Sequence, residues 1–187
     1  MLYFQIRGKI DMVLNHTKNT ISNLKILVLE DDALMTKLYR DILESMGFGK
    51  VTAIRNAEDA LALVKQINFD LIICDWKLNG TSGIDFVKHI RALHDYEKCN
   101  VPIVMISGKA SLEDVAIARD AGITEYIVKP FTIKAICAKL RSIIEAPRKF
   151  VIAPEFIGPD RRRKAAPALN IENYERRLYA NESYYCN

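Results

Sequence analysis

The chain has no long apolar stretch, no closely paired cysteines and no internal repeat, and each absence excludes a class of protein. No apolar run approaches the roughly 18 residues that a membrane helix needs. The first residues also lack the charged start and apolar core of a secretory signal. Four cysteines without CxxC spacing are expected to be free thiols in a reducing cytoplasm rather than metal ligands. The lack of a repeat argues against a solenoid.

The net charge of +4 is concentrated at the two ends of the chain. Residues 1–22 carry +2, residues 23–146 carry −1 and residues 147–187 carry +3. A basic end attracts nucleic acid or an acidic partner, but this excess is too small to establish either. Within the first segment, Leu2-Tyr3-Phe4-Gln5 resembles the middle of a common protease tag site, so whether residues 1–22 are native stays open.

Between residues 23 and 146 the sequence alternates between strand and helix patterns. Continuous apolar runs predict five strands, at residues 25–29, 51–54, 71–75, 101–106 and 125–128. Apolar residues at helical spacing follow each of them, and one such stripe includes Arg91. Five alternations with short connections predict a mostly parallel sheet with helices on both faces.

Short polar residues mark where the helices begin. Asn56, Ser111 and Thr132 stand directly before helical stripes, where such side chains cap the first turn. Asp32 has the same position before the first helix and is more simply a cap than a metal ligand. Gly47 supplies the stop of that helix.

Polar side chains also stand where the strands end. Glu30 and Asp31 end the first strand, and Asp75, Ser107 and Lys129 end the third, fourth and fifth. Because the carboxyl ends of parallel strands meet at one edge of a sheet, these groups are expected to converge. Clustered carboxylates repel one another unless a cation joins them, and Mg²⁺ is the usual choice where phosphate is involved. A lysine and a hydroxyl suit the oxygens of a phosphoryl group.

Four motifs carry a family resemblance: Leu29-Glu30-Asp31-Asp32, Cys74-Asp75-Trp76, Ile106-Ser107-Gly108 and Tyr126-Ile127-Val128-Lys129-Pro130-Phe131. In this order at strand ends they resemble the receiver domains of two-component response regulators, over about residues 23–146. The resemblance implies an α/β, flavodoxin-like, doubly wound fold with a five-stranded parallel sheet of order 2-1-3-4-5. Residues 147–187 form a short C-terminal extension to it.

The resemblance also implies a chemistry and roles for particular residues. A phosphoryl group would pass from a phosphohistidine to Asp75, the nucleophile, giving an aspartyl phosphate. Asp31, Asp75 and the backbone carbonyl of Lys77 would hold Mg²⁺, and Glu30 would act through metal-bound water. Lys129 would pair with the phosphoryl oxygens.

A switch is implied as well. Ser107 would hydrogen-bond the phosphoryl group and move towards it, while the ring of Tyr126 swings inward in step. The Lys129-Pro130 bond resembles the family's cis peptide bond. Trp76 is expected to be an exposed ring near the site.

Lys77 and Lys109 each stand two residues beyond a site residue, Asp75 and Ser107. In the resembled family these positions border the phosphoryl group and influence its hydrolysis. Two interpretations stay open: the lysines are simply solvated, or they hold anions near the site and alter the lifetime of the acyl phosphate.

The alternation stops after Pro147. Residues 150–160 mix large apolar residues with Pro and Gly, which favours docking on the chain's own receiver or on a neighbouring subunit in a dimer. The basic run at 161–164 is more often solvated or acid-paired than a nucleic-acid reader. Residues 170–180 carry one weak helical stripe, and no helix-turn-helix pair fits the segment.

These observations favour a cytoplasmic phosphoacceptor whose donor is a sensor histidine kinase or a histidine phosphotransfer protein. Phosphorylation would switch partner binding or self-association, through the tail or the surface of the last two helices. Such a protein assists its own phosphorylation and is not an enzyme in the usual sense. A transcriptional or RNA-binding regulator using the basic tail is the alternative. A small hydrolase ranks last, because no His or Ser stands with the acids as nucleophile and base.

Overall fold

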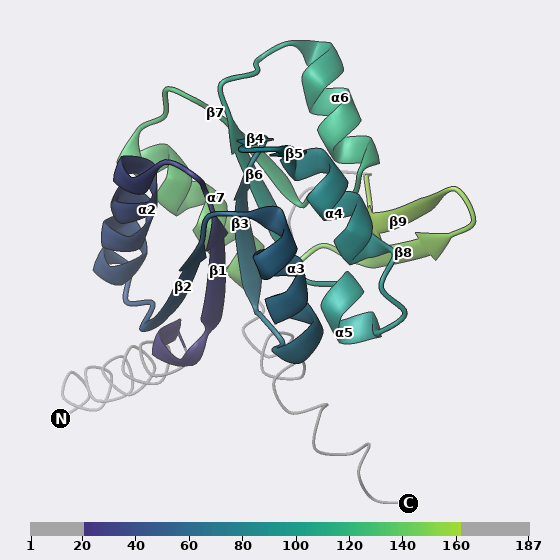
Figure 1. The fold of residues 1–187 in the computed structure, drawn as a ribbon, viewed down its shortest axis with the longest axis horizontal. Helices are drawn as coiled ribbons and strands as arrows, with labels where there is room; N and C mark the ends of the chain where they lie inside the picture. The colour runs from purple at the N-terminus through teal and green to yellow at the C-terminus, as the bar shows by residue number, and fades with distance from the viewer. Residues whose placement is uncertain (1–20, 162–187) are drawn as a thin grey trace, which may run out of the picture.

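The computed structural model describes residues 21–161 and has a five-stranded parallel sheet at its centre. Its order is β2-β1-β3-β6-β7, which is the predicted order 2-1-3-4-5 (Figure 1). The strands are β1 (Lys25–Leu29), β2 (Lys50–Ile54), β3 (Leu71–Asp75), β6 (Ile103–Ser107) and β7 (Glu125–Val128). The fold prediction is therefore confirmed. Residues 1–20 and the weak stripe at 170–180 lie outside the described residues.

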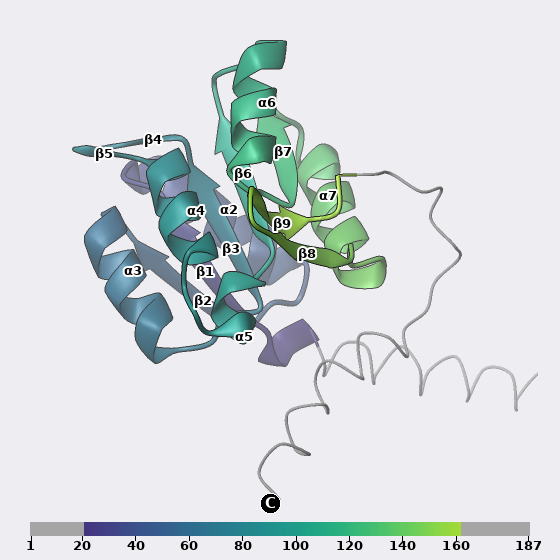
Figure 2. The same ribbon diagram turned by 90° about the vertical axis from the view of Figure 1, so that its right-hand side faces the viewer.

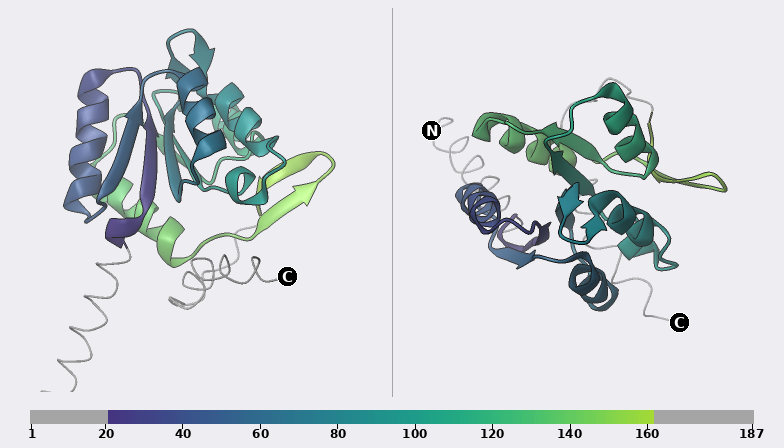
Figure 3. Two further views of the ribbon diagram at one scale, coloured as in Figure 1. Left: turned by 60° about the horizontal axis from the view of Figure 1, so that its bottom comes forward. Right: turned by 45° about the horizontal axis from the view of Figure 1, so that its top comes forward.

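Helices cover both faces of the sheet, as the alternation predicts (Figures 1 and 3). On one face lie α2 (Ala33–Ser45) and α7 (Ile133–Glu145). The other face is covered by α3 (Ala57–Gln66), α4 (Gly83–Arg91) and α6 (Leu112–Asp120). In the described part of the chain, no helix has the length and apolar character needed to cross a membrane.

Strand β3 shows why the apolar runs are continuous. Leu71 and Ile73 pack against α2 and α7, whereas Ile72 and Cys74 pack against α3 and α4. Alternate side chains thus enter two separate cores, and neither face has room for a polar residue. The first polar side chain of the strand is the one at its carboxyl end.

The helix starts are capped by the expected side chains. Asp32 accepts hydrogen bonds from the amides of Leu34 and Met35, at 2.7 and 2.9 Å. Asn56, Ser111 and Thr132 each accept one from an amide three residues on. The carboxylate of Asp32 is therefore occupied as a cap.

Two hairpins and one short helix were not anticipated from the sequence. A short hairpin, β4 (Lys77–Leu78) and β5 (Thr81–Ser82), follows β3, and a one-turn helix, α5 (Tyr96–Cys99), precedes β6. In the C-terminal extension, β8 (Phe150–Ala153) and β9 (Phe156–Pro159) form an antiparallel hairpin.

This tail hairpin, residues 150–159, packs on its own chain, on the side of the molecule away from α2 (Figures 1 and 2). The Phe150 ring meets the Tyr96 ring edge-on at 6.3 Å. Ion pairs flank the hairpin: Arg148 binds Glu125 at the start of β7, and Arg161 binds Asp120 of α6 at 3.2 Å. The expected docking on the same chain is found for this part of the extension.

Beneath the tail hairpin lies Arg91, only 4% exposed. Its guanidinium donates to the carbonyls of Gly122 and Val101, both at 2.9 Å, and of Cys99 at 2.5 Å. It also lies 5.4 Å from the centroid of the Phe150 ring. Arg91 thus ties together the loops that precede β6 and β7, at the amino edge of the sheet. Burial lowers the pKa of this guanidinium.

Candidate functional site

Three of the predicted site residues meet at the carboxyl edge of the sheet. The ammonium of Lys129, after β7, lies 2.8 Å from Oδ2 of Asp75 and 3.2 Å from Oε2 of Glu30. Asp75 is the last residue of β3, and Glu30 directly follows β1; these two strands are neighbours in the sheet. The predicted convergence is found for Lys129, Asp75 and Glu30, and the Lys129-Pro130 peptide bond is cis, as expected.

The carboxylate of Asp75 is held on both oxygens. While Oδ2 faces Lys129, Oδ1 accepts from the amide of Trp76 at 2.6 Å and from that of Lys77 at 3.4 Å. The Asp75 side chain remains 12% exposed, so solvent reaches it. The buried strand and the backbone amides that follow it therefore hold the Asp75 carboxylate at a fixed position.

The charges of the cluster influence one another. Burial, and then the charge of Asp75, raises the pKa of Glu30, although Lys129 opposes this. Burial alone would lower the pKa of Lys129, but the hydrogen bond and charge of Asp75 and the charge of Glu30 raise it overall. The lysine is therefore firmly cationic, and the two carboxylates repel one another across it.

The acids also have the chemistry of a Mg²⁺ site. Asp31 follows Glu30 directly and is half-buried. Between residues 21 and 161, no three Asp, Glu, His or Cys side chains gather closely enough to form a metal cage. Mg²⁺ does not require one, because it keeps several waters and is commonly bound through one or two carboxylates. The oxygen donors and the repulsion between Glu30 and Asp75 fit an open, hydrated ion.

Ser107 and Tyr126 meet at the turn between β6 and α6. The Ser107 side chain is buried, and its Oγ accepts from the amide of Lys109 at 3.1 Å. The Tyr126 hydroxyl donates to the carbonyl of Lys109 at 2.9 Å. The structure thus brings the two predicted switch residues onto one turn; their movement stays a prediction.

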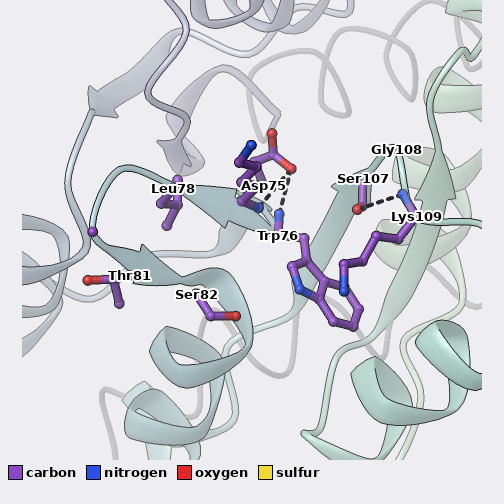
Figure 4. Close-up of a pocket in the computed structure, with 10 residues that line it drawn as sticks. Asp75, Trp76, Leu78, Thr81, Ser82, Ser107, Gly108 and Lys109 are labelled. Carbon is purple, nitrogen blue, oxygen red and sulfur yellow. Dashed lines mark hydrogen bonds between the residues drawn. The ribbon is translucent and has the colours of Figure 1, made fainter.

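A pocket of about 620 Å³ opens beside Asp75 (Figure 4). One wall is the β4–β5 hairpin, with Leu78, Thr81 and Ser82, and the other is the turn from Ser107 to Lys109. Sequence reasoning predicted that Asp75, Glu30 and Lys129 would lie together, but it missed this hairpin wall. Only the Asn79-Gly80 dipeptide signalled it, because such a pair favours a hairpin turn.

Trp76 is buried, which corrects the expectation of an exposed ring. It is only 9% exposed, because the ammonium of Lys109 lies 4.4 Å from the ring centroid and the Tyr126 ring meets it edge-on at 6.4 Å. Lys109 also pairs with Asp114 at 3.3 Å. The side chain of Lys77, by contrast, is exposed on β4.

Comparison with known proteins identifies the family to which a chain with this site belongs. Residues 26–141 match the model of the response regulator receiver domain family. The chemotaxis protein CheY-3 of Vibrio cholerae is 37% identical over 123 residues, 66% of this chain and 93% of that protein. CheY of Pseudomonas aeruginosa is 30% identical over 122 residues, covering 65% and 97%. The chain belongs to the response regulator receiver domain family.

Solved structures agree. Vibrio cholerae CheY4 superposes with a TM-score of 0.59 at 26% identity, covering 64% of this chain and 98% of that one. The receiver domain of a sensor histidine kinase from P. aeruginosa, with a magnesium ion coordinated in its active-site cleft, gives 0.57 at 25% identity, covering 63% and 94%. The tail hairpin lies outside the family match, which ends at residue 141.

Proposed function

We propose that this protein is a cytoplasmic phosphoacceptor of a two-component phosphorelay, which takes a phosphoryl group from a phosphohistidine onto Asp75. The observation that carries the proposal is the position of Asp75 at the carboxyl end of β3, with the Lys129 ammonium 2.8 Å from it and an open pocket beside it. A sensor histidine kinase or a histidine phosphotransfer protein is the donor.

In the reaction, a carboxylate oxygen of Asp75 forms a bond to phosphorus as the phosphorus–nitrogen bond breaks, and the electron pair of that bond returns to the imidazole nitrogen. The backbone amides of Trp76 and Lys77 hold the carboxylate in place. Lys129 is close enough to pair with the phosphoryl oxygens where charge develops. The protein is consumed as the acceptor, so it is a signalling protein rather than an enzyme.

A magnesium ion belongs to the proposal. Glu30 (through water), Asp31, Asp75 and the carbonyl of Lys77 would hold it, and when bound it neutralises charge on the phosphoryl oxygens. The mutual repulsion of the acids supports this assignment.

Phosphorylation of Asp75 would change the conformation of the β6–α6 turn. A near-dianionic group on Asp75 attracts the Ser107 hydroxyl, and Tyr126 follows because both residues hydrogen-bond Lys109. We expect the surface of α6 and α7 to change, altering partner binding or self-association. The nucleic-acid alternative is less well supported, since Arg161, the first residue of the basic run, is paired with Asp120.

The test is transfer from a radiolabelled phosphohistidine protein in the presence of Mg²⁺. We expect wild type to be labelled, Asp75→Asn to remain unlabelled, and a chelator to suppress labelling of wild type. Asp70→Asn is the matched control, because Asp70 directly precedes the opposite end of β3, where it accepts a hydrogen bond from the amide of Lys25. Equal labelling of the Asp75→Asn variant would sink the assignment.

A further inference from the structure

Lys109 makes contacts with four groups around the pocket. Its amide donates to Ser107 Oγ, and its carbonyl accepts from the Tyr126 hydroxyl. Its ammonium lies over the Trp76 ring at 4.4 Å and pairs with Asp114 of α6 at 3.3 Å. The backbone of this one residue therefore contacts both proposed switch residues, while its side chain contacts Trp76 and Asp114.

The cation–π contact joins the two sides of the pocket. Trp76 directly follows Asp75 at the end of β3, whereas Lys109 belongs to the turn after β6 (Figure 4). The amide of Trp76 donates to the Asp75 carboxylate, and the indole receives the ammonium. A continuous chain of contacts thus runs from the acceptor through Trp76 to the turn that carries Ser107.

We propose that Lys109 is a positioning residue that fixes the β6–α6 turn over the pocket and so sets where the hydroxyls of Ser107 and Tyr126 stand relative to Asp75. This inference rests on the proposed function. It differs from both sequence interpretations of Lys109, because the ammonium, on a side chain that is 52% exposed, is held by the Trp76 ring and by Asp114. Lys109 acts through its neighbours and does not bind the phosphoryl group.

Lys77 provides the internal comparison for the ring contact. It lines the same pocket from the other wall, but among residues 21–161 its side chain has no ring contact or ion pair. Replacing either lysine removes one positive charge from the pocket. Only replacement of Lys109 removes the contact with Trp76.

Trp76 is the single tryptophan of the chain, so the tryptophan fluorescence comes from this one ring and its surroundings. In the unphosphorylated full chain we expect Lys109→Met to shift the emission and to increase quenching by acrylamide, since the ring loses its cover. Lys109→Arg should restore the wild-type emission, because a guanidinium also binds an indole face. Lys77→Met should leave the emission unchanged. Identical spectra for wild type and Lys109→Met would overturn the proposal.

The second readout is phosphorylation of Asp75 by a small phosphoramidate with Mg²⁺, followed over a range of donor concentrations. We expect Lys109→Met to lower the maximal rate about two- to fivefold, the factor that an exposed cation–π contact is worth, with no change in half-saturating donor concentration. Lys109→Arg should recover the rate. A raised half-saturating concentration at an unchanged maximal rate would instead show that Lys109 attracts the donor, and would overturn the positioning role.

The experiments distinguish failure of the proposed function from failure of the role given to Lys109. If wild type takes no label from any phosphohistidine or phosphoramidate donor, the proposed function falls and the positioning role falls with it, even where the emission confirms the contact. If wild type is labelled but Lys109→Met matches it in rate and half-saturation, the proposed function stands and only the role of Lys109 is wrong.

Discussion

Two cations lie at opposite edges of the same sheet, in different surroundings. At the carboxyl edge, Lys129 lies between the carboxylates of Asp75 and Glu30, beside an open pocket. At the amino edge, Arg91 donates only to backbone carbonyls and is covered by the Phe150 ring of the tail hairpin.

The contrast distinguishes Lys129, which lies in a site suited to chemistry, from Arg91, which stabilises the fold. Neighbouring acids raise the pKa of Lys129, whereas burial lowers that of Arg91. A compact ammonium on a flexible stem is free to follow an arriving phosphoryl group, whereas the planar guanidinium suits several carbonyls held at fixed positions. We therefore expect Lys129 to govern phosphorylation and Arg91 to govern stability.

The largest effect is expected from Lys129→Met. Removing the cation that faces the developing charge should lower the rate of Asp75 phosphorylation about 10²–10³-fold. Circular dichroism should still show a folded protein. Labelling at the wild-type rate would contradict the role given to Lys129.

Arg91→Met should show the opposite behaviour. Three buried carbonyls lose their donor, so the free energy of unfolding should fall by about 2–4 kcal/mol in urea titrations. Arg91→Lys should lose less, since one ammonium still reaches some of these carbonyls. Under conditions where the variant is folded, phosphorylation of Asp75 should proceed as in wild type. If Arg91→Met were as stable as wild type but poorly phosphorylated, the assignment of a purely structural role to Arg91 would be wrong.

A comparison of two glycines tests how closely the tail hairpin packs against Gly122. Gly47 and Gly122 have nearly equal positive φ angles, 95° and 98°. A Cβ on Gly47 meets nothing within 4 Å, whereas one on Gly122 would lie 2.5 Å from the carbonyl oxygen of Ile157. Both alanine variants should lose about 1–2 kcal/mol to backbone strain, and Gly122→Ala should lose about 1 kcal/mol more. Equal losses would mean that the hairpin packs loosely there.

The smallest effect concerns Glu30. Its pKa is raised above the usual value of 4.5, so the folded state binds more protons and stability falls as pH rises through the window above that value. Glu30→Gln should remove this loss and slightly raise the free energy of unfolding at neutral pH. Urea titrations at pH 4 and pH 7 test it, with Glu44→Gln, an exposed acid of α2, as the control. An unchanged pH dependence in Glu30→Gln would contradict the assignment.

The carboxyl edge could be predicted from the sequence, but the amino edge could not. Asp75 and Lys129 end apolar runs, and parallel strands bring such ends together whatever the details of packing. The caps Asp32 and Asn56 are equally local signals.

The tail hairpin has no such local signal, since β8 and β9 have only four residues each and β9 contains Gly158 and Pro159. Its position depends on Arg91 and Tyr96, more than fifty residues earlier in the chain. An arginine inside the apolar stripe of a helix was the one clue to it. Trp76 is covered by Lys109, in the turn after β6, and by Tyr126 of β7, so its burial also depends on long-range contacts.

Reductive trapping tests the central claim most directly. Borohydride converts an aspartyl phosphate to homoserine, so wild type phosphorylated in Mg²⁺, reduced and digested should contain homoserine at position 75 alone when peptides are sequenced by mass spectrometry. Homoserine at another acid, with Asp75 intact, would contradict the assignment of this carboxylate as the acceptor.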